Sequence, residues 1–596
     1  MRRWAPRLLP CLLAVSWPAH AALLLTVEAG IPDAELEASR RLVEATLARL
    51  PPALQDWDAT LTLGWRDDLP AQVHGRILRQ RIMLDRALLA AWSTSGPTSA
   101  RGAAVAALVH EIAHAWDLGP GGLSREPRTL DLAGWQVRPL WPGRDARNAF
   151  GERSPDAYEL ASPAEFVAVN LEHFLLDPAY ACRRPSLHAH LSAHLGWSPP
   201  AQPCPVTLPY VDAGVLTDAD AAPLLELDPA RVYAVDFLLA DGSDAVMSRW
   251  GHSMLRLVVC APGRAPGPEC RLDLDHHRVL SFRAFVDDVQ VSNWRGLTGG
   301  YPSRLFVLPL QQVIDEYTRV ELRGLDSLPL RLDADDIAAL LQRAARVHWS
   351  YDGHYRFVGN NCAVETFKLL HDGVPRLAAA DLSGITPKGL LRRLRRAGVV
   401  DDAQVPAGAM EALRLGYRFE PWSTHYAALY EVARAELALP AENVDAWFAL
   451  PPQVRAEWLP HADMRASAAL LLLEEAALQR LELRARDVLK RRLSRRDAGE
   501  LAPVVRAALR DGSVFSSPAE LVSLPGYGLP QHEEREQARS GAAARAARLR
   551  GVEADLRAQA RAWLDPGMRA TLRQVEANVA RIGLRLRALA TPQRAG

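Results

Sequence analysis

The chain has 596 residues, of which 49% are apolar and 23% are charged. This length exceeds a single hydrophobic core and predicts about two to four domains. Lys and Arg total 70, as do Asp and Glu, so no overall field favours nucleic acid or a membrane surface, and we expect no nucleic-acid partner.

The first 21 residues, "MRRWAPRLLPCLLAVSWPAHA", are typical of a secretory signal peptide. Two early arginines precede an apolar stretch that ends in the small-residue pattern Ala19-His20-Ala21, which predicts cleavage before Ala22. No later segment offers the ~18 uninterrupted apolar residues that a spanning helix needs. The sequence therefore predicts a periplasmic or secreted protein with no transmembrane segment after cleavage.

Five cysteines remain after that cleavage: Cys182, Cys204, Cys260, Cys270 and Cys362. Each of the first two pairs brackets a Pro-containing segment, and an oxidising compartment favours disulfides, so we expect Cys182–Cys204 and Cys260–Cys270. Cys362 is then the odd cysteine, and it is either an intermolecular link or a reactive thiol.

Residues 22–210 alternate strand and helix patterns, as in "ALLLTVEA" followed by "PDAELEASRRLVEATLARL". A helix is predicted over "SARGAAVAALVHEIAHAWDL", and a second one begins at Ser162-Pro163, where Ser is a helix cap and Pro suits the first helical position. We expect an α+β domain here.

The first of these helices contains His110-Glu111-Ile112-Ala113-His114. Residues four apart lie on one helical face, so both imidazoles can bind one metal ion, and Glu111 can act beside them as a general base. The pattern predicts a zincin-like domain with zinc as its cofactor.

A zinc site of this kind needs a third protein ligand. We prefer Glu165, because "AEFVAVN" resembles the downstream helix of gluzincin peptidases; Glu172 and Glu159 are the alternatives. In a different interpretation, the histidines meet carboxylates without any metal.

Residues 231–400 carry short β-type runs, "RVYAVDFLLAD", "HSMLRLVVCA", "CRLDLDHHRVLSFRAF" and "SRLFVLPL", followed by helices. His252 begins one predicted strand, and Cys362 begins a predicted helix. A papain-like site places a Cys at a helix N-terminus opposite a His on a strand, where the helix dipole and imidazolium lower the thiol pKa. The alternative for Cys362 is a buried, inert thiol.

"RWGHSMLRL" and "GNNCAVETFKLL" resemble the periplasmic domain of the Lnb family of bacterial envelope proteins over residues 231–375. The resemblance implies a permuted NlpC/papain-like fold, related to the lecithin:retinol acyltransferase group, with His252 and Cys362 as the catalytic pair. Characterised members are lipoprotein N-acyltransferases, which implies an acyl group carried by Cys362 and an envelope protein, lipoprotein or lipid as substrate. Those transferases continue into a membrane-embedded region, whereas this chain continues into a polar helical one.

A third catalytic residue would orient the imidazole. Four polar residues after His252 are candidates: Asp275, His276, His277 and Ser281. Asn360 or Asn361 could cap the helix or donate to an oxyanion.

Residues 401–596 are rich in Ala, Leu, Arg and Glu and predict helices, either as a bundle or as an arm that binds a partner. The whole chain thus predicts an α+β multidomain protein: a zincin-like domain, a permuted papain-like domain and a helical region. We expect a thiol acyltransferase or amidohydrolase of the cell envelope with an additional zinc site. The alternatives are a secreted gluzincin-type metallopeptidase and a non-enzymatic envelope scaffold. The sequence does not predict an oligomeric state.

Overall fold

The structure is a computed structural model that describes residues 22–70, 73–94, 100–216, 218–243, 249–284, 300–493, 507, 511–515 and 517–590. The predicted signal peptide, residues 1–21, lies outside the described residues. The chain separates into two compact units. Unit 1 is formed within Met1–Glu126, Ser162–Ala181 and Leu187–Gln202, and unit 2 within Pro127–Ala161, Cys182–Ser186 and Pro203–Gly596.

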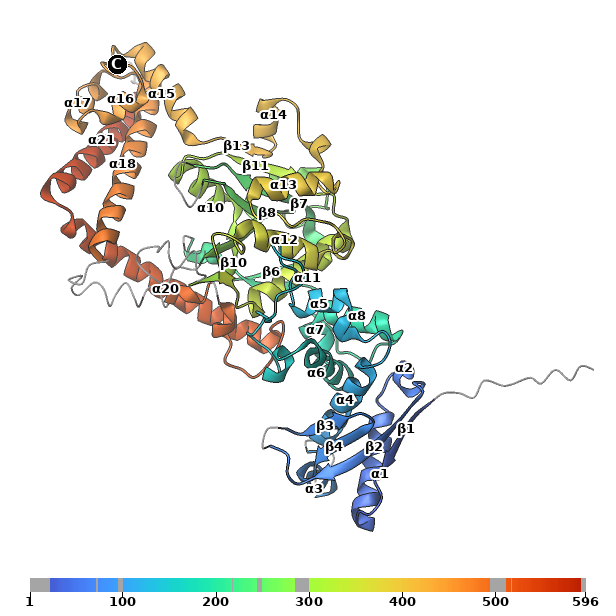
Figure 1. The fold of residues 1–596 in the computed structure, drawn as a ribbon. Helices are drawn as coiled ribbons and strands as arrows, with labels where there is room; N and C mark the ends of the chain where they lie inside the picture. The colour runs from blue at the N-terminus through green and yellow to red at the C-terminus, as the bar shows by residue number, and fades with distance from the viewer. Residues whose placement is uncertain are drawn as a thin grey trace, which may run out of the picture. The chain divides into compact units, whose positions relative to one another are not determined.

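The architecture is α+β and multidomain with a mainly helical C-terminal region, as the sequence predicts. Unit 1 contains a four-stranded sheet in the order β1-β2-β4-β3 (Figure 1). The first three of these strands are parallel, and β3 pairs antiparallel with β4. The strands are β1 (Leu23–Val27), β2 (Ala59–Arg66), β3 (Gly75–Leu78) and β4 (Arg81–Asp85).

The helices of unit 1 include the two that carry the predicted metal ligands, α4 and α6, which pack against each other. Ser162 caps α6, since its Oγ accepts the N–H of Glu165 at 3.2 Å, and Pro163 occupies the first helical position. The longer helices are α1 (Asp33–Leu47), α3 (Arg86–Thr94), α4 (Ala100–Asp117) and α6 (Pro163–Leu176). The short helices α2 (Pro52–Gln55), α7 (Tyr180–Arg183) and α8 (Pro185–Leu195) complete the set, and α7 and α8 contribute residues to both units.

Unit 2 contains a seven-stranded antiparallel sheet in the order β12-β10-β9-β8-β7-β11-β13. The central strands are apolar on both faces, which fits a sheet covered on both sides. The strands are β7 (Val232–Ala240), β8 (His252–Val259), β9 (Arg278–Ala284), β10 (Tyr301–Pro309), β11 (Leu325–Pro329), β12 (His354–Tyr355) and β13 (Arg418–Phe419). A separate pair, β5 (Leu208–Val211) and β6 (Leu224–Leu227), forms a short hairpin sheet.

Helix α12 (Cys362–Gly373) packs on β8, and α13 (Pro387–Arg396) packs on β7 (Figure 1). Every residue of α12 is buried, because α11 (Ala334–Ser350) and α5 (Pro127–Ala133) also pack against it. Asp333 caps α11 through a capping box with Asp336. The remaining short helices near the sheet are α10 (Leu310–Ile314) and α14 (Ala409–Arg414).

Both predicted disulfides are present, Cys182–Cys204 and Cys260–Cys270. The segment that follows Cys270 differs from the prediction of one continuous strand, since it forms two 3-10 turns before β9 begins at Arg278. The reason is a buried ion pair: Arg271 turns inward and donates to Asp236 at 2.7 Å and 2.9 Å.

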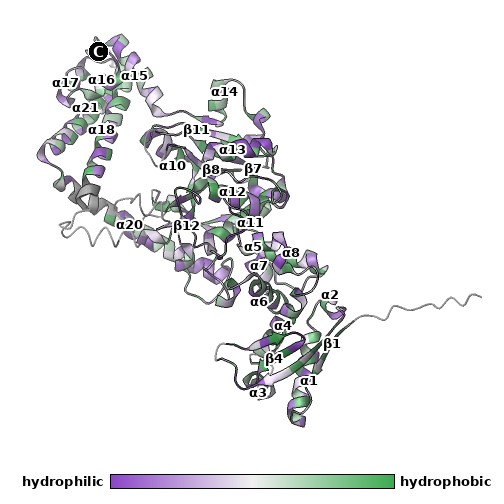
Figure 2. Cartoon of the chain, in the orientation of Figure 1, coloured by the Kyte–Doolittle hydropathy of each residue, from purple (hydrophilic) through white to green (hydrophobic). Residues whose placement is uncertain are grey.

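The C-terminal helices share a core of their own that includes Tyr430 and Trp447. Arg455 and Glu474 form a buried ion pair there, and Asn578 also donates to Glu474 at 3.1 Å. Apolar and polar residues alternate along α18, α20 and α21 (Figure 2), which favours the bundle interpretation. The helices of this core are α15 (Trp422–Glu436), α16 (Val444–Ala449), α17 (Pro452–Ala456), α18 (Met464–Leu493) and α21 (Pro566–Ala590). The buried alanines of α20 (His532–Trp563) belong instead to the core that contains the seven-stranded sheet.

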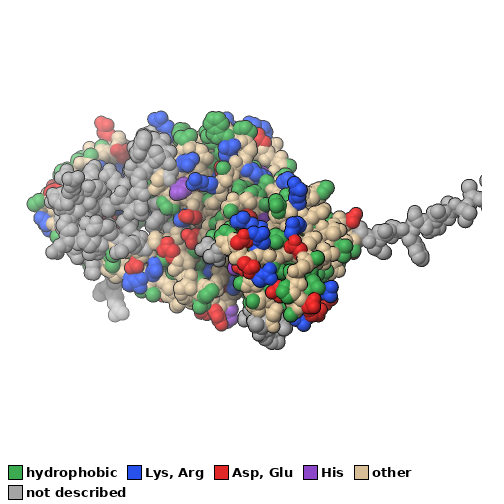
Figure 3. Space-filling view, turned by 60° about the horizontal axis from the view of Figure 1, so that its bottom comes forward, with side chains coloured by type: hydrophobic (Ala, Val, Ile, Leu, Met, Phe, Trp, Pro, Cys, Tyr) green, Lys and Arg blue, Asp and Glu red, His purple; other side chains and the backbone are tan. Residues whose placement is uncertain are grey.

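Acidic and basic side chains intermix over the described part of the face in Figure 3, in keeping with the balanced composition. Across the described ranges, no helix combines the length and the apolar character needed to cross a bilayer.

Candidate active site and metal centre

Cys362 is the first residue of α12, and the residue before it holds that end of the helix in place. The Asn361 Oδ1 accepts the N–H groups of Ala363 at 3.0 Å and Val364 at 3.3 Å. Its Nδ2 donates to the carbonyl oxygens of Phe357 and Ile385. Asn361 is therefore the helix cap, one of the two roles that the sequence allows.

The Cys362 thiol is 5% exposed and is the free cysteine of the described chain. Burial raises its pKa above the ordinary value, although hydrogen bonds from Ser253 and Tyr355 oppose that shift. The Cys362 N–H also donates to the Tyr355 hydroxyl at 3.3 Å. The papain-like pattern predicts a lowered thiol pKa, and the direction differs here because the sulfur is enclosed away from water.

His252 begins β8, and its imidazole is held between a serine and a tyrosine. The Nε2 atom lies 3.2 Å from Ser281 Oγ, and the ring stacks on Tyr317 with centroids 6.1 Å apart. Burial, together with the positive charges of Arg283 and Arg323, lowers the His252 pKa to about 3. The imidazole is therefore neutral near pH 7, and at this pKa it is a weak base in the free protein.

His252 and Cys362 share neighbouring residues but, within the described contacts, do not form a hydrogen bond with each other. Ser253, the residue after His252, opposes the rise in the Cys362 pKa. Tyr317 stacks on His252, and its own pKa is raised by burial and also by Cys362. A proton transfer between the pair requires a movement of one side chain or a bound substrate between them.

Of the four candidates for the third residue, Ser281 is the one that meets His252. His277 instead lies 2.9 Å from Arg256 Nη2 and 2.8 Å from the Cys270 carbonyl oxygen. Asp275 and His276 are exposed in the 3-10 turn that precedes β9.

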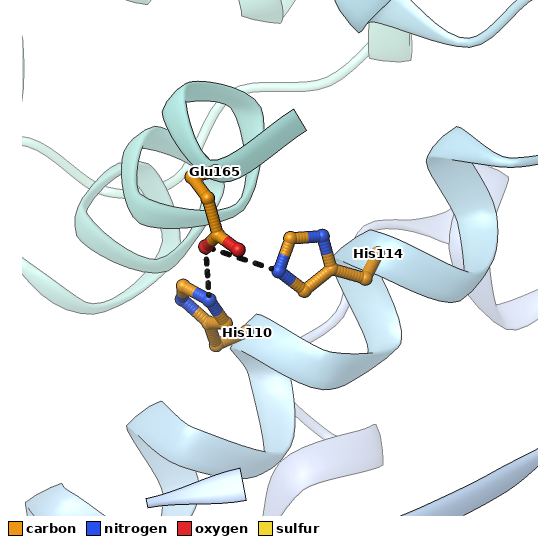
Figure 4. Close-up of side chains that lie close together, drawn as sticks. All are labelled: His110, His114 and Glu165. Carbon is orange, nitrogen blue, oxygen red and sulfur yellow. Dashed lines mark hydrogen bonds and ion pairs between the residues drawn. The ribbon is translucent and has the colours of Figure 1, made fainter. Parts of the chain in front are cut away.

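In unit 1, His110 and His114 face Glu165 across the α4–α6 contact (Figure 4). One oxygen of Glu165 lies 3.3 Å from Nε2 of both histidines. Burial lowers the His110 pKa, but the pairs with Glu165 and Glu172 outweigh it and raise the value to about 9. Hydrogen bonds from the two histidines lower the Glu165 pKa to about 2.

The two alternative ligands are placed differently. Glu172 reaches the other nitrogen of His110, with Oε2 at 3.5 Å from Nδ1, which is the position of a carboxylate that orients a ligand. Glu159 belongs to unit 2, where it forms a buried ion pair with Arg184. Glu165 is thus the carboxylate that lies against both imidazoles.

Glu111 is 5% exposed, and burial raises its pKa. Its side chain lies against β3 at Gly75, where an added Cβ would come within 2.7 Å of Glu111 Oε1. The ligand atoms of His110, His114 and Glu165 lie within 4.8 Å of one another. Two imidazoles and one carboxylate, half-buried on packed helices, fit the ligand set of a zinc site that leaves a fourth position for water.

A second group of metal-type ligands lies in unit 2: Asp131, His371 and Asp372, all buried. Arginines already neutralise it, since Arg144 contacts Asp131 at 2.6 Å and Arg343 contacts Asp372 at 2.7 Å. A cation placed there would face two guanidinium groups, so this cluster fits a structural ion-pair network rather than a metal.

Two parts of the chain match known protein families. Residues 219–397 match the family described as the Lnb N-terminal periplasmic domain. This part of the chain is an Lnb-family periplasmic domain. Residues 24–120 and 121–204 match a domain of unknown function, DUF7844. No curated protein and no solved structure matches the chain.

The Lnb domain identifies the protein as one of the cell envelope, periplasmic or secreted. Its site includes three residues that sequence reasoning missed: Ser253, Tyr317 and Tyr355. Tyr355 stands seven residues before Cys362, and only the turn over "RFVGN", with its Arg356–Asn360 bridge, brings its hydroxyl back to the helix end. Gly359, with φ of +101°, supplies the turn and is a signal that the sequence did contain.

Proposed function

We propose that the protein is a thiol acyltransferase or amidohydrolase of the cell envelope, with Cys362 as the nucleophile and His252 as its base. One observation carries this proposal: within the described chain, the cysteine left outside the disulfides begins a helix, against the strand that begins with His252. An acyl lipid, a lipoprotein or another envelope protein is the substrate that the Lnb resemblance favours.

The reaction begins with both groups neutral. The sulfur attacks the carbonyl carbon of the acyl donor while the thiol proton passes to His252, and a thioester forms. The bond from the carbonyl carbon to the leaving alcohol or amine breaks, and the leaving group takes the proton from His252. Water or an acceptor amine then attacks the thioester and restores the Cys362 thiol.

The negative charge on the carbonyl oxygen requires hydrogen-bond donors during this attack. The Cys362 N–H and the Tyr355 hydroxyl lie together beside the sulfur, 3.3 Å apart. Both would donate to the oxyanion, with Tyr355 giving up the bond that it accepts in the free protein.

Release of p-nitrophenol from a p-nitrophenyl acyl ester tests the proposal. The full chain should turn over the ester, Cys362→Ala should abolish the turnover, and His114→Ala should leave it unchanged. Turnover that survives Cys362→Ala would contradict the thiol assignment, and turnover lost in His114→Ala would assign the reaction to unit 1.

A zinc-dependent hydrolase is the second candidate, and the convergence of His110, His114 and Glu165 supports it. These three residues would hold zinc, which when bound supplies a Lewis acid. Glu111 would accept a proton from water, since its carboxylate is buried beside the ligands. Glu111→Gln should keep the metal but lose any chelator-sensitive peptide hydrolysis. A non-enzymatic scaffold would show neither reaction.

A further inference from the structure

A short hairpin in unit 2, residues 136–145, presents apolar side chains at its tip. Val137 pairs antiparallel with Arg144, and the Asp145 N–H donates to the Gln136 carbonyl at 2.8 Å. Gly143 turns the chain with φ of +88°. The hairpin is therefore held by its own backbone hydrogen bonds, and we refer to residues 136–145 as the docking hairpin.

The base of the docking hairpin is fixed to the helix that carries Cys362. The Gln136 side chain donates to Asp372 of α12 at 3.2 Å, and Asp145 lies 3.7 Å from Nζ of Lys368. These two contacts hold the base of the docking hairpin against α12.

The tip carries Leu140, 48% exposed, and Trp141, 69% exposed. Leu140 lies over the turn that precedes Cys362, because a Cβ on Gly359 would be 3.8 Å from its Cδ1 atom. Val358, 51% exposed, belongs to the same turn. Three large apolar side chains thus stand in water beside the candidate nucleophile, an arrangement that indicates a binding surface.

Basic side chains occur in the docking hairpin, two residues after it, and in the turn that precedes Cys362. Arg138, Arg147 and Arg356 are exposed, and within the described chain none of the three forms an ion pair. The acidic residue of the hairpin, Asp145, is already close to Lys368. The rim of the tip therefore carries uncompensated positive charge.

We propose that the docking hairpin and Val358 bind the surface of a bilayer that contains anionic phospholipids. Tryptophan and leucine partition into the boundary between headgroups and acyl chains, and arginine pairs with anionic headgroups. A protein partner of ordinary affinity needs about 800 Å² from each side, more than a narrow convex tip offers, whereas a bilayer takes up such a tip readily. This inference goes beyond the proposed function and does not depend on Cys362 being a nucleophile.

Co-sedimentation of the full chain with vesicles tests the proposal. We expect binding to vesicles of phosphatidylcholine mixed with an equal amount of phosphatidylglycerol, and much weaker binding to phosphatidylcholine alone. The double variant Leu140→Glu and Trp141→Glu should lose the binding. Arg147→Gln should weaken it about fivefold, which corresponds to about 1 kcal/mol.

Two controls accompany these variants. Met410, 78% exposed on α14, is an apolar residue outside the tip, and Met410→Glu should bind as the wild type does. Cys362→Ser should also bind normally, which separates membrane binding from catalysis. Unchanged thermal midpoints would show that each variant folds. The proposal is overturned if the wild type ignores both kinds of vesicle, if it binds both equally, or if the double variant binds as the wild type does.

Discussion

The two candidate sites place their titratable groups in opposite electrostatic conditions. In unit 1, His110 has a pKa raised to about 9 and Glu165 one lowered to about 2, so both are charged near pH 7. In unit 2, His252 has a pKa lowered to about 3 and Cys362 one that is raised, so both are neutral. The first site stabilises charge on its own titratable residues before any ligand arrives, whereas the second keeps its histidine and its thiol neutral.

This difference indicates how each site would work. A half-buried group of histidines that already face a carboxylate can exchange protons for a metal ion. A buried neutral pair acts only when a substrate supplies the group that the thiol attacks, which protects the sulfur from unrelated electrophiles. The account therefore predicts metal binding without substrate in unit 1 and no strong thiol reactivity without substrate in unit 2.

The largest expected effect is the loss of zinc from a ligand variant. The purified protein should hold about one zinc ion, and His114→Ala should hold almost none after dialysis, because only two ligands remain. His194→Ala is a suitable control, since this unit 1 histidine packs on Trp116 outside the ligand group. Elemental analysis checks the result, and a full zinc content in His114→Ala would rule out this site.

A smaller effect separates the glutamates. Glu172→Gln should weaken zinc binding by about 10- to 100-fold, because Glu172 orients His110 without binding the metal itself. Glu159→Gln should leave zinc affinity unchanged. Competition with a chromophoric chelator measures both affinities, and equal losses in the two variants would contradict the assignment of Glu172.

The unit 2 site predicts slow alkylation of the free thiol. Because burial raises the Cys362 pKa, the thiolate fraction is small at neutral pH and increases as pH rises toward that pKa. Labelling with iodoacetamide at pH 7.5 should be slower than for an unperturbed, exposed cysteine in a denatured sample of the same protein.

The same labelling tests the charge state of His252. A neutral imidazole does not stabilise a thiolate by charge, so His252→Ala should label at nearly the wild-type rate in the absence of substrate. A marked decrease in that variant would instead support the thiolate–imidazolium pair that the sequence pattern predicts.

The smallest expected effect concerns the cap of α12. Asn361→Ala should lower the free energy of unfolding by about 1 kcal/mol, since two N–H groups lose their acceptor. Asn443→Ala, at the exposed cap of α16, removes the acceptor of one N–H and should cost no more than this. Only Asn361→Ala should also reduce ester turnover. Equal turnover in the two variants would show that the cap of α12 does not contribute to the active site.

The sequence predicts what local spacing determines. The i, i+4 histidines, the Ser162 cap and both disulfides each depend on residues that are close in the chain. The sequence could not single out Ser281 among the four candidates for the third catalytic residue. The side chains of β9 that face His252 depend on how β9 pairs with β8 and β10, and the local sequence pattern does not specify that register.

Two features depended on tertiary structure alone. The Cys362 pKa is raised because the whole of α12 is buried. The sequence indicates where a helix begins but not whether that helix is buried. The segment 127–161 lies between the two ligand helices in sequence yet packs in unit 2, through contacts such as Gln136 with Asp372. Such long-range hydrogen bonds leave no periodic signal in the chain.

The central claim, that Cys362 forms a thioester with His252 as its base, is tested most directly by intact-mass analysis. The full chain is mixed with a p-nitrophenyl acyl ester and quenched in acid. The account predicts a single acyl adduct on Cys362 that hydroxylamine removes, with none in Cys362→Ser and almost none in His252→Ala. An adduct that persists in Cys362→Ser, or its absence from the wild type while His252→Ala labels normally with iodoacetamide, would contradict the account.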